Sequence, residues 1–372
     1  MKSKLILLLI LLISVKNYSQ ITTSINNYTE NDKLIYLDSA GNITSEIAHK
    51  YYRIIKDYNL EKKNYRVFDY YRSGSLFMEG TSDNRELVLK NGLFTYYYEN
   101  GNKKGVANYV NRVQEGEEIK WYKNGVKQSV KNYANGKLDG KNSSWYDNGN
   151  QKSTSFYIRG GVNGKVTDWY ENGNKKSEVV YEFITTKLSA TTTSKTTEVK
   201  INQFWDENGV QKVIDGNGDY EIDENNFYAQ GKVKNGYYDG VWKGNYKNYN
   251  YRYNEIYKDN RFVSGEGIDK DNLTHQYTSI RTKPQPKNGI TDLNKYIAKN
   301  FQMKNTDNFS GNLFVSIEVE ADGTVSNVKI IKDIGNDASQ ELIRVLKGYK
   351  DWNPGELRGR KVKSTITLPI AI

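Results

Sequence analysis

Few residues of this chain have the types and spacing that catalysis or metal binding requires. Its 372 residues include two histidines, His49 and His275, and no cysteine. Neither histidine stands in a zinc-binding HExxH motif, and without cysteine there is no thiolate ligand and no disulfide. The sequence also lacks a GxSxG nucleophile turn, a phosphate-binding GxxxxGK[ST] loop and a dinucleotide-binding fingerprint. We therefore expect a protein that is not an enzyme and uses no metal or other cofactor.

One segment partly matches a calcium-binding loop. Oxygen-bearing side chains occupy the first, third, fifth and ninth positions of that loop: Asp215, Asn217, Asp219 and Asp223. However, Tyr220 stands where the loop needs a glycine, and Asn226 stands where a bidentate glutamate should complete the coordination. A glycine-rich hairpin turn is the better interpretation.

The aromatic residues of the chain follow a regular period. The chain has 31 Tyr and 6 Trp but only 4 Pro, a composition typical of pleated strands joined by tight turns. Four motifs recur every 24 residues: YYENG from Tyr97, WYKNG from Trp121, WYDNG from Trp145 and WYENG from Trp169. Their turn residues are Asn100, Gly101, Asn124, Gly125, Asn148, Gly149, Asn172 and Gly173. A tyrosine follows twelve positions after the first aromatic residue of each motif. A glycine follows nineteen positions after it in the first three motifs. The motifs therefore belong to internal repeats that share one 24-residue period.

Each repeat reads as strand, turn, strand. An Asn-Gly pair between aromatic and β-branched residues favours a type I′ hairpin turn, because both central residues of that turn need positive φ. The later glycine, as at Gly116, Gly140 and Gly164, would form the turn into the next unit. Because a single hairpin is unstable in water, we expect neighbouring units to pair their edges and stack their rings. The polar insertion at residues 185–197 reads as a surface loop.

The WYxNG core, the downstream tyrosine and the spaced glycines resemble the bacterial variant of the MORN repeat. The resemblance covers residues 70–267, within an array that we place at 66–280. It implies an interaction or membrane-associated protein, and no catalytic residue belongs to the motif. Two interpretations of the aromatic residues stay open: ring packing between repeats, and a face that binds glycan or lipid. Residues 20–65 should form an N-terminal cap with a strand at 35–37, a turn at 38–42 and a helix or mixed segment at 45–58.

The composition changes at residues 283–287, KPQPK, where two of the four prolines fall together. We expect an extended linker at 281–288, followed by a small α+β domain at 289–372. Its expected elements are a helix at 291–301, strands at 313–320 and 325–332 around a turn at 321–324, an amphipathic helix at 337–349 and a final strand at 361–372. The predicted fold is thus mainly β, an elongated hairpin array followed by this small domain.

The order of VSIEVEADGTVSNVKIIKDIG, the helix, WNPG at 352–355 and TITLPIAI resembles the C-terminal domain of TonB. The resemblance implies a periplasmic domain that contacts outer-membrane transporters by adding a partner segment to a sheet edge. The candidate edge residues lie in the last strand: Val362, Ser364, Ile366 and Leu368. The alternative is an ordinary edge strand blunted by Lys361, Lys363 and Pro369. The intramembrane histidine and the proline-rich spacer of the TonB energy transducer have no counterpart here.

The start of the chain reads as an export signal. Residues 1–19 combine basic residues, an apolar run at 5–15 and a polar end, the layout of a signal peptide. Their removal changes the net charge from +10 to +7, with 51 basic against 44 acidic residues. Lysines and glutamates are interspersed, so a nucleic-acid partner is not expected.

These features predict an exported protein of the periplasm or cell envelope that binds a protein partner. We expect an adaptor that docks an outer-membrane transporter of the TonB-dependent kind, with a role in transmembrane transport. The alternatives are a structural protein whose array binds glycan or a membrane surface, and a toxin-neutralising repeat protein.

Overall fold

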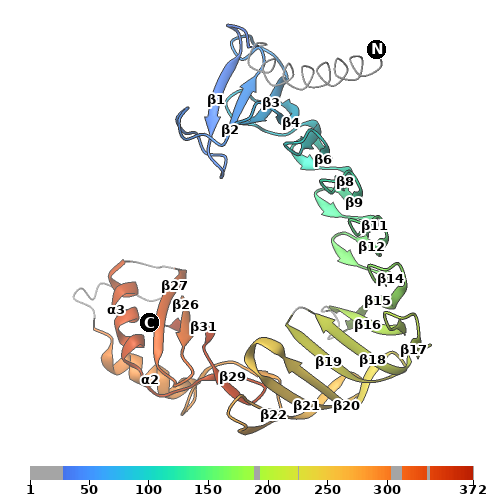
Figure 1. The fold of residues 1–372 in the computed structure, drawn as a ribbon. Helices are drawn as coiled ribbons and strands as arrows, with labels where there is room; N and C mark the ends of the chain where they lie inside the picture. Colours follow the sequence, from blue (N-terminus) through green and yellow to red (C-terminus); the bar gives the residue numbers. More distant parts are fainter. Residues whose placement is uncertain (1–27, 188–192, 225, 303–311, 333–335, 372) are drawn as a thin grey trace. The chain divides into compact units, whose positions relative to one another are not determined.

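The computed structural model describes residues 28–187, 193–224, 226–302, 312–332 and 336–371. The chain divides into two compact units, residues 1–215 and 216–372, and Figure 1 shows the elements of each. Both units consist mainly of antiparallel strands, and two described helices lie near the C-terminus. The predicted fold class is therefore confirmed. The expected signal segment lies outside the described residues.

The first unit begins with four strands: β1 (Lys33–Leu37), β2 (Tyr51–Ile55), β3 (Tyr65–Tyr71) and β4 (Leu76–Ser82). Strands β1 and β2 lie within residues 20–65, the segment predicted to be an N-terminal cap. The expected strand at 35–37 lies within β1. Of the helix or mixed segment expected at 45–58, the helix is wrong, because turns there flank residues 51–55, which form β2 between β1 and β3. Tyr52 and Ile54 are buried on one face of this strand, and its aromatic and β-branched residues favour a pleated, half-buried surface.

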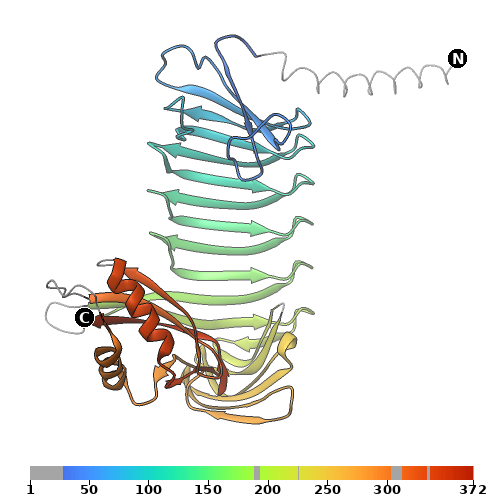
Figure 2. The same cartoon turned by 90° about the vertical axis from the view of Figure 1, so that its left-hand side faces the viewer.

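The repeats form consecutive hairpins in one antiparallel sheet (Figure 2). Their long strands are β5 (Gly92–Tyr97), β6 (Lys103–Val110), β8 (Gly116–Trp121), β9 (Lys127–Ala134), β11 (Gly140–Trp145), β12 (Gln151–Ile158), β14 (Gly164–Trp169), β15 (Lys175–Lys187), β16 (Thr193–Trp205) and β17 (Gln211–Ile214). Short strands join successive hairpins: β7 (Val113–Gln114), β10 (Lys137–Leu138) and β13 (Gly161–Val162). The insertion expected to be a surface loop instead lengthens β15 and β16, where Thr185 pairs with Lys195. Its residues 188–192 lie outside the described residues.

The turns of the repeats differ from the expected type. Gly125 has a φ of 87°, but Asn124 does not have a positive φ. The Gly125 N–H donates to the Tyr122 carbonyl over 2.9 Å, and the strand register shifts at Trp121. This geometry is a type I turn with a glycine bulge. The type I′ turns lie at the other end of the hairpins, as at Asn135 and Gly136 with φ values of 51° and 74°.

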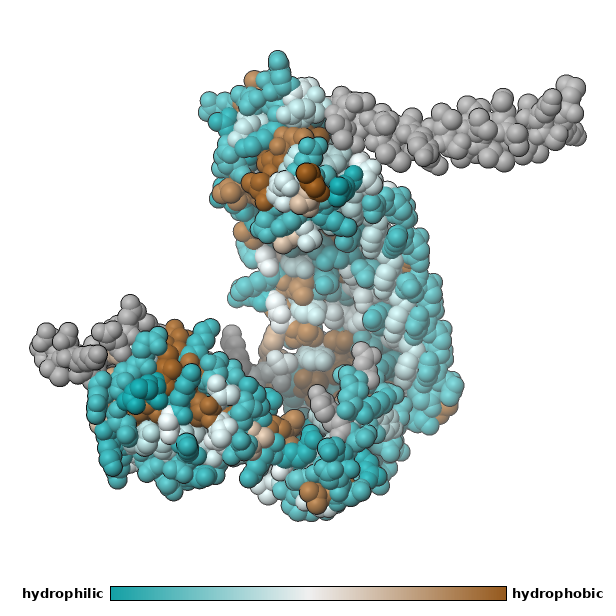
Figure 3. Space-filling view, turned by 60° about the vertical axis from the view of Figure 1, so that its left-hand side comes forward, coloured by the Kyte–Doolittle hydropathy of each residue, from teal (hydrophilic) through white to brown (hydrophobic). Residues whose placement is uncertain are grey.

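The turns that join one repeat to the next therefore lie earlier in the chain than Gly116, Gly140 and Gly164, the glycines that were expected to form them. Gly116, Gly140 and Gly164 have positive φ, but each one starts the next long strand. The array buries mainly small or polar residues in its centre: Ala107, Ser129, Asn142, Thr167 and Ser177. Figure 3 shows hydrophilic residues over most of the visible surface, interrupted by separate hydrophobic patches.

The second unit starts with a six-stranded meander: β18 (Asn217–Glu224), β19 (Phe227–Lys234), β20 (Tyr237–Tyr246), β21 (Tyr251–Lys258), β22 (Arg261–Ile268) and β23 (Thr274–Tyr277). A three-stranded sheet follows, in the order β27 (Val325–Lys332), β26 (Asn312–Val319) and β31 (Ser364–Ala371). Two helices, α2 (Ile290–Asn300) and α3 (Asn336–Gly348), pack on one face of this sheet. These elements match the predicted α+β order.

The stretch expected to be a linker takes part in sheet pairing. Strand β24 (Arg281–Thr282) pairs with β29 (Gly355–Leu357), which also pairs with β30 (Arg360–Val362). Strand β25 (Gln285–Pro286) pairs with β28 (Trp352–Asn353). The residues at 281–288 are thus extended, as their prolines indicate, but they are fixed to the C-terminal domain.

Candidate functional site

Strand β31 forms one edge of the C-terminal sheet. It pairs with β26 along its whole length, from Ser364 opposite Val319 to Ala371 opposite Asn312. No second strand pairs with β31 among the described residues. Its side chains alternate, with Ile366 and Leu368 packed against the core and Thr365, Thr367 and Pro369 exposed. The strand thus presents a backbone edge, with Ile366 and Leu368 turned inward.

Three of the four predicted edge residues lie in β31: Ser364, Ile366 and Leu368. The fourth, Val362, lies in β30 and pairs with Gly355. The structure therefore separates Val362 from the edge. A partner strand would meet the backbone of β31 and the exposed side chains of Thr365 and Thr367. The period-two alternation of Thr365 to Pro369 is the sequence signal that separates these two sets.

Lys363, which could discourage pairing at this edge by its charge, forms ion pairs within the sheet instead. The Lys363 ammonium lies 3.0 Å from a Glu318 carboxylate oxygen and 2.8 Å from one of Glu320. Hydrogen bonds with these carboxylates raise the pKa of Lys363 and lower the pKa of both glutamates. Lys363 therefore fastens the start of β31 to the end of β26, and its charge is compensated there.

A compact core supports the edge strand. Helix residues Leu293, Leu342 and Leu346 belong to one buried cluster with the inward side chains of β26. The Tyr349 hydroxyl donates to Asp292 over 2.8 Å, and burial together with this hydrogen bond raises the pKa of Tyr349. The core also contains Trp352 of the WNPG motif, 1% exposed. One face of the sheet, including the inward side chains of β31, is thus covered by this core.

A buried ion pair fixes the C-terminal domain to the last hairpins of the meander. Arg358 lies in the turn between β29 and β30 and is 8% exposed, and Glu255 of β21 is 2% exposed. The Arg358 Nε atom lies 2.7 Å from a Glu255 carboxylate oxygen. Tyr277 and Tyr257 each donate a hydroxyl hydrogen bond of 2.9 Å to that carboxylate. The charge pair is thus hydrogen-bonded on both sides, as a buried pair requires.

Aromatic rings enclose the guanidinium. Arg358 lies 4.1 Å from the ring centre of Tyr253 and donates to the Tyr246 hydroxyl. Burial alone would lower the pKa of Arg358, but the hydrogen bond and charge of Glu255 outweigh it and raise that pKa. Burial first, and then Glu255, raises the pKa of Tyr257 and Tyr277. Sequence reasoning missed this cluster because its partners are 103 residues apart.

The predicted repeat residues form a ladder of hydrogen bonds between neighbouring hairpins. In each turn, the tyrosine after the first aromatic residue donates its hydroxyl to a carbonyl one repeat further on: Tyr98 to Trp121, Tyr122 to Trp145, Tyr146 to Trp169 and Tyr170 to Trp205. The turn asparagines donate to the next turn as well: Asn100 to Lys123, Asn124 to Asp147, Asn148 to Glu171 and Asn172 to Glu207. These bonds explain why the repeats need Tyr and Asn at fixed positions.

Lysines lie over several of the aromatic rings in the array. The Lys127 ammonium lies 5.7 Å from the ring centre of Trp145, and that of Lys175 lies 5.1 Å from Trp205. Ring-to-ring contacts occur in the flanking hairpins, as between Tyr52 and Tyr70, which are stacked at 5.1 Å. The aromatic residues of the repeats therefore take part in packing and hydrogen bonding within the sheet.

The segment that partly matched a calcium loop forms a tight turn. Asp215 and Gly216 have φ values of 47° and 78° between β17 and β18. Asp219 and Asp223 form ion pairs with Lys232 and Lys247, each over 3.0 Å. In the part of the chain that the structure describes, no three His, Asp or Glu side chains gather as a metal site. His275 instead contacts Asp269 over 2.8 Å.

Comparison with known proteins identifies one region of the chain. None of the described helices has the length and apolar character needed to cross a membrane. A search of curated proteins found no match. No family model supports the MORN-like interpretation of the repeats, which stays a prediction. The family model described as the Gram-negative bacterial TonB protein C-terminal matches residues 303–371. Residues 303–371 therefore carry a TonB C-terminal domain, a domain type of the Gram-negative envelope.

Proposed function

We propose that this chain is a non-enzymatic envelope protein that docks an outer-membrane transporter through strand β31. The observation that carries the proposal is the free edge of β31, which no strand of the described residues pairs with, in a domain that matches the TonB C-terminal family. Domains of this family commonly interact with outer-membrane proteins. An added partner strand would supply backbone hydrogen bonds along an edge strand that is already paired with β26 on its other side.

The position of Pro369 sets the register of the proposed docking. Proline lacks an N–H, and in edge strands its nitrogen faces away from the paired neighbour. Because backbone groups alternate with a period of two, Thr365 and Thr367 would then also direct their N–H and C=O groups outward. The proposed edge offers two donors, followed by a proline that stops further pairing. A short partner segment fits this edge, and such a small interface gives a transient complex.

The proposal includes export of the chain and gives the C-terminal domain a docking role. Residues 1–19 would direct the chain across the inner membrane, so that the C-terminal domain reaches the periplasm. The hairpin array would act as an extended, hydrogen-bonded body instead of a proline-rich spacer. Docking by β31 with a role in transport is the function that these features favour together.

The chain lacks native cysteine, so a single introduced cysteine can report the docking strand. We expect Thr367→Cys in the full chain to cross-link to an outer-membrane transporter in cells, with the linked peptide coming from a short periplasmic segment of that transporter. Lys329→Cys on β27, the opposite edge of the sheet, is the control. Mass spectrometry of the adducts gives the result.

A second variant tests the register. Thr367→Pro removes one outward N–H, so it should abolish capture of the transporter while circular dichroism stays unchanged. Thr365→Ala keeps its backbone N–H and should preserve capture. Equal cross-linking from Lys329→Cys, or normal capture by Thr367→Pro, would refute docking at this edge.

A further inference from the structure

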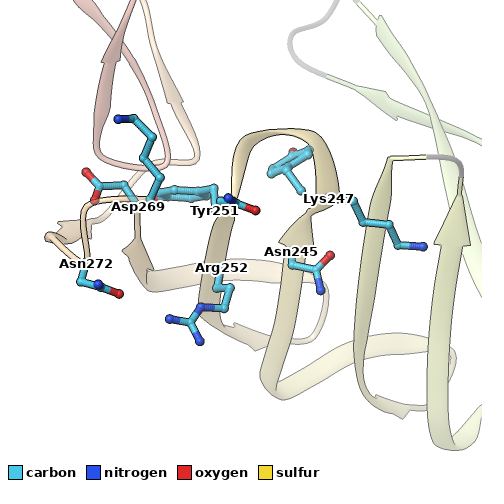
Figure 4. Close-up of a pocket in the computed structure, with 9 residues that line it drawn as sticks. Asn245, Lys247, Tyr251, Arg252, Asp269 and Asn272 are labelled. Carbon is cyan, nitrogen blue, oxygen red and sulfur yellow. The ribbon is translucent and has the colours of Figure 1, made fainter.

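A polar depression lies at one end of the meander in the second unit. The turn between β20 and β21, which includes the short helix η1 (Lys247–Tyr249), forms one wall, and the loop between β22 and β23 forms the other. Its volume is about 410 Å³. A second depression of about 340 Å³ adjoins it and shares Asn250, Asp269 and Lys270. Figure 4 shows side chains from strands and loops around the first depression.

Carboxamides and cations dominate the two walls. Asn245 and Arg252 stand opposite each other on adjacent strands, so their side chains share one face of the sheet. Asn250 and Asn272 come from the two loops. The cations of the two depressions are Lys247, Arg252, Lys270 and Arg360.

The acidic residues here are already engaged. Asp269 accepts hydrogen bonds of 2.9 Å from the N–H groups of Asp271 and Leu273, and it contacts His275 over 2.8 Å. The hydrogen bond from His275, together with those N–H groups, lowers the pKa of Asp269. Asp271 pairs with Lys270 over 3.3 Å. The carboxylates of Asp269 and Asp271 are therefore already bound by N–H groups of the loop, by His275 and by Lys270.

Two arginines keep unused hydrogen-bonding capacity. The Arg252 guanidinium makes no hydrogen bond or ion pair within the described residues, and the side chain is exposed. Arg360 lies 4.0 Å from the ring centre of Tyr251, and its Nε atom is buried without a partner in the described structure. The Asn245 Oδ1 atom is also buried without a described donor. Buried polar atoms normally have partners, so this end of the sheet has both a donor and an acceptor to satisfy.

We propose that this depression binds an anionic sugar, with a phosphate or carboxylate held by Arg252 and hydroxyl groups held by the asparagines. Guanidinium groups bind phosphate and carboxylate in a fixed fork geometry. Carboxamides both donate and accept, which suits hydroxyl groups that do the same. Arg360 lies at the adjoining depression and adds positive charge for a longer ligand. The site is separate from β31, so it does not depend on the docking function.

Isothermal titration of the full chain with four probes tests this site: glucose 6-phosphate, glucuronate, glucose and inorganic phosphate. We expect at least one anionic sugar to bind about tenfold more tightly than either glucose or phosphate. Glucose 6-phosphate and glucuronate distinguish a phosphate from a carboxylate ligand. Arg252→Gln should weaken binding by about tenfold or more, the loss of one charged contact.

Lys258→Gln is the matched control, because it removes one positive charge at the opposite end of the same strand. It should leave binding unchanged. Asn250→Gly keeps the left-handed backbone of that position, where φ is 46°, while removing its carboxamide, and should weaken sugar binding. Failure of both anionic sugars to bind, equal binding of inorganic phosphate, or equal losses in Arg252→Gln and Lys258→Gln would overturn the proposal.

Discussion

At the scale of single residues, the ion pair of Arg358 and Glu255 should have the largest effect on stability. Removing one member of a buried pair leaves an uncompensated charge and costs about 3–5 kcal/mol. Arg358→Asn removes the guanidinium but suits the left-handed backbone, where φ is 51°. We expect this variant to lower the free energy of unfolding of residues 216–372 by about that amount. Hydrogen exchange should increase in β20, β21, β29 and β30, while exchange in residues 28–187 stays unchanged.

A double variant controls for the loss of charge alone. Arg358→Asn with Glu255→Gln removes both charges and keeps a hydrogen-bond acceptor for Tyr257 and Tyr277. It should recover part of the lost stability. Arg358→Asn with an effect below about 1 kcal/mol, the range of an exposed pair, would contradict the anchoring role.

Asp32 gives a prediction about pH. Burial opposes its ionisation, but hydrogen bonds from Lys56 and from the N–H groups of Thr29 and Asp57 outweigh burial and lower its pKa from 3.8 to about 2. A lowered pKa gives stability above the unfolded pKa that is lost as pH falls through the folded pKa, here from about pH 4 to pH 2. Asp32→Asn should therefore cost about 1–2 kcal/mol at neutral pH, allowing for solvent screening. Urea titrations at several pH values should show this difference vanishing near pH 2.

At the scale of elements, the ladder of hydrogen bonds predicts that each tyrosine hydroxyl stabilises the contact between two neighbouring hairpins. Tyr146→Phe removes the hydroxyl that bonds Trp169 and should cost about 1 kcal/mol, the usual value of one hydrogen bond. Exchange of amides in β14 should increase. Tyr157→Phe in the same repeat is the control, because its hydroxyl bonds no described residue. Equal losses in the two variants would argue against the ladder.

The hairpins could be predicted from sequence, whereas their turn geometry could not. The Asn-Gly pair fits both a type I′ turn and the glycine-bulge turn, so the dipeptide alone does not decide. The side chain of Asn124 decides it: Oδ1 accepts from the Val126 N–H, and Nδ2 donates to Asp147 in the next hairpin. That second bond exists only when repeats are stacked, and the local pattern contains no information about it.

At the scale of the whole molecule, the sequence predicted the order of the parts but not the contacts that join them. Alternation and helical period identified β26, β27, α2 and α3, because those patterns are local. The helix considered for 45–58 was wrong, since pairing with two neighbouring strands overrides local propensity. The pairing of β24 and β25 and the Arg358 cluster depend on residues far apart in the chain. Val362 was assigned to the edge strand because nothing local separates β30 from β31.

These long-range contacts predict how the second unit responds to truncation. A fragment of residues 216–372 keeps every described contact of the unit and should unfold in one transition. A fragment of residues 289–372 loses β24 and β25, so β28 and β29 lose strand partners and Trp352 loses the neighbouring Pro286. It also leaves Arg358 without Glu255. We expect its unfolding free energy to be lower by about 2–4 kcal/mol or more, as for a disrupted core. Thermal denaturation followed by circular dichroism compares the two fragments, and equal stability would mean that residues 216–288 do not support the C-terminal domain.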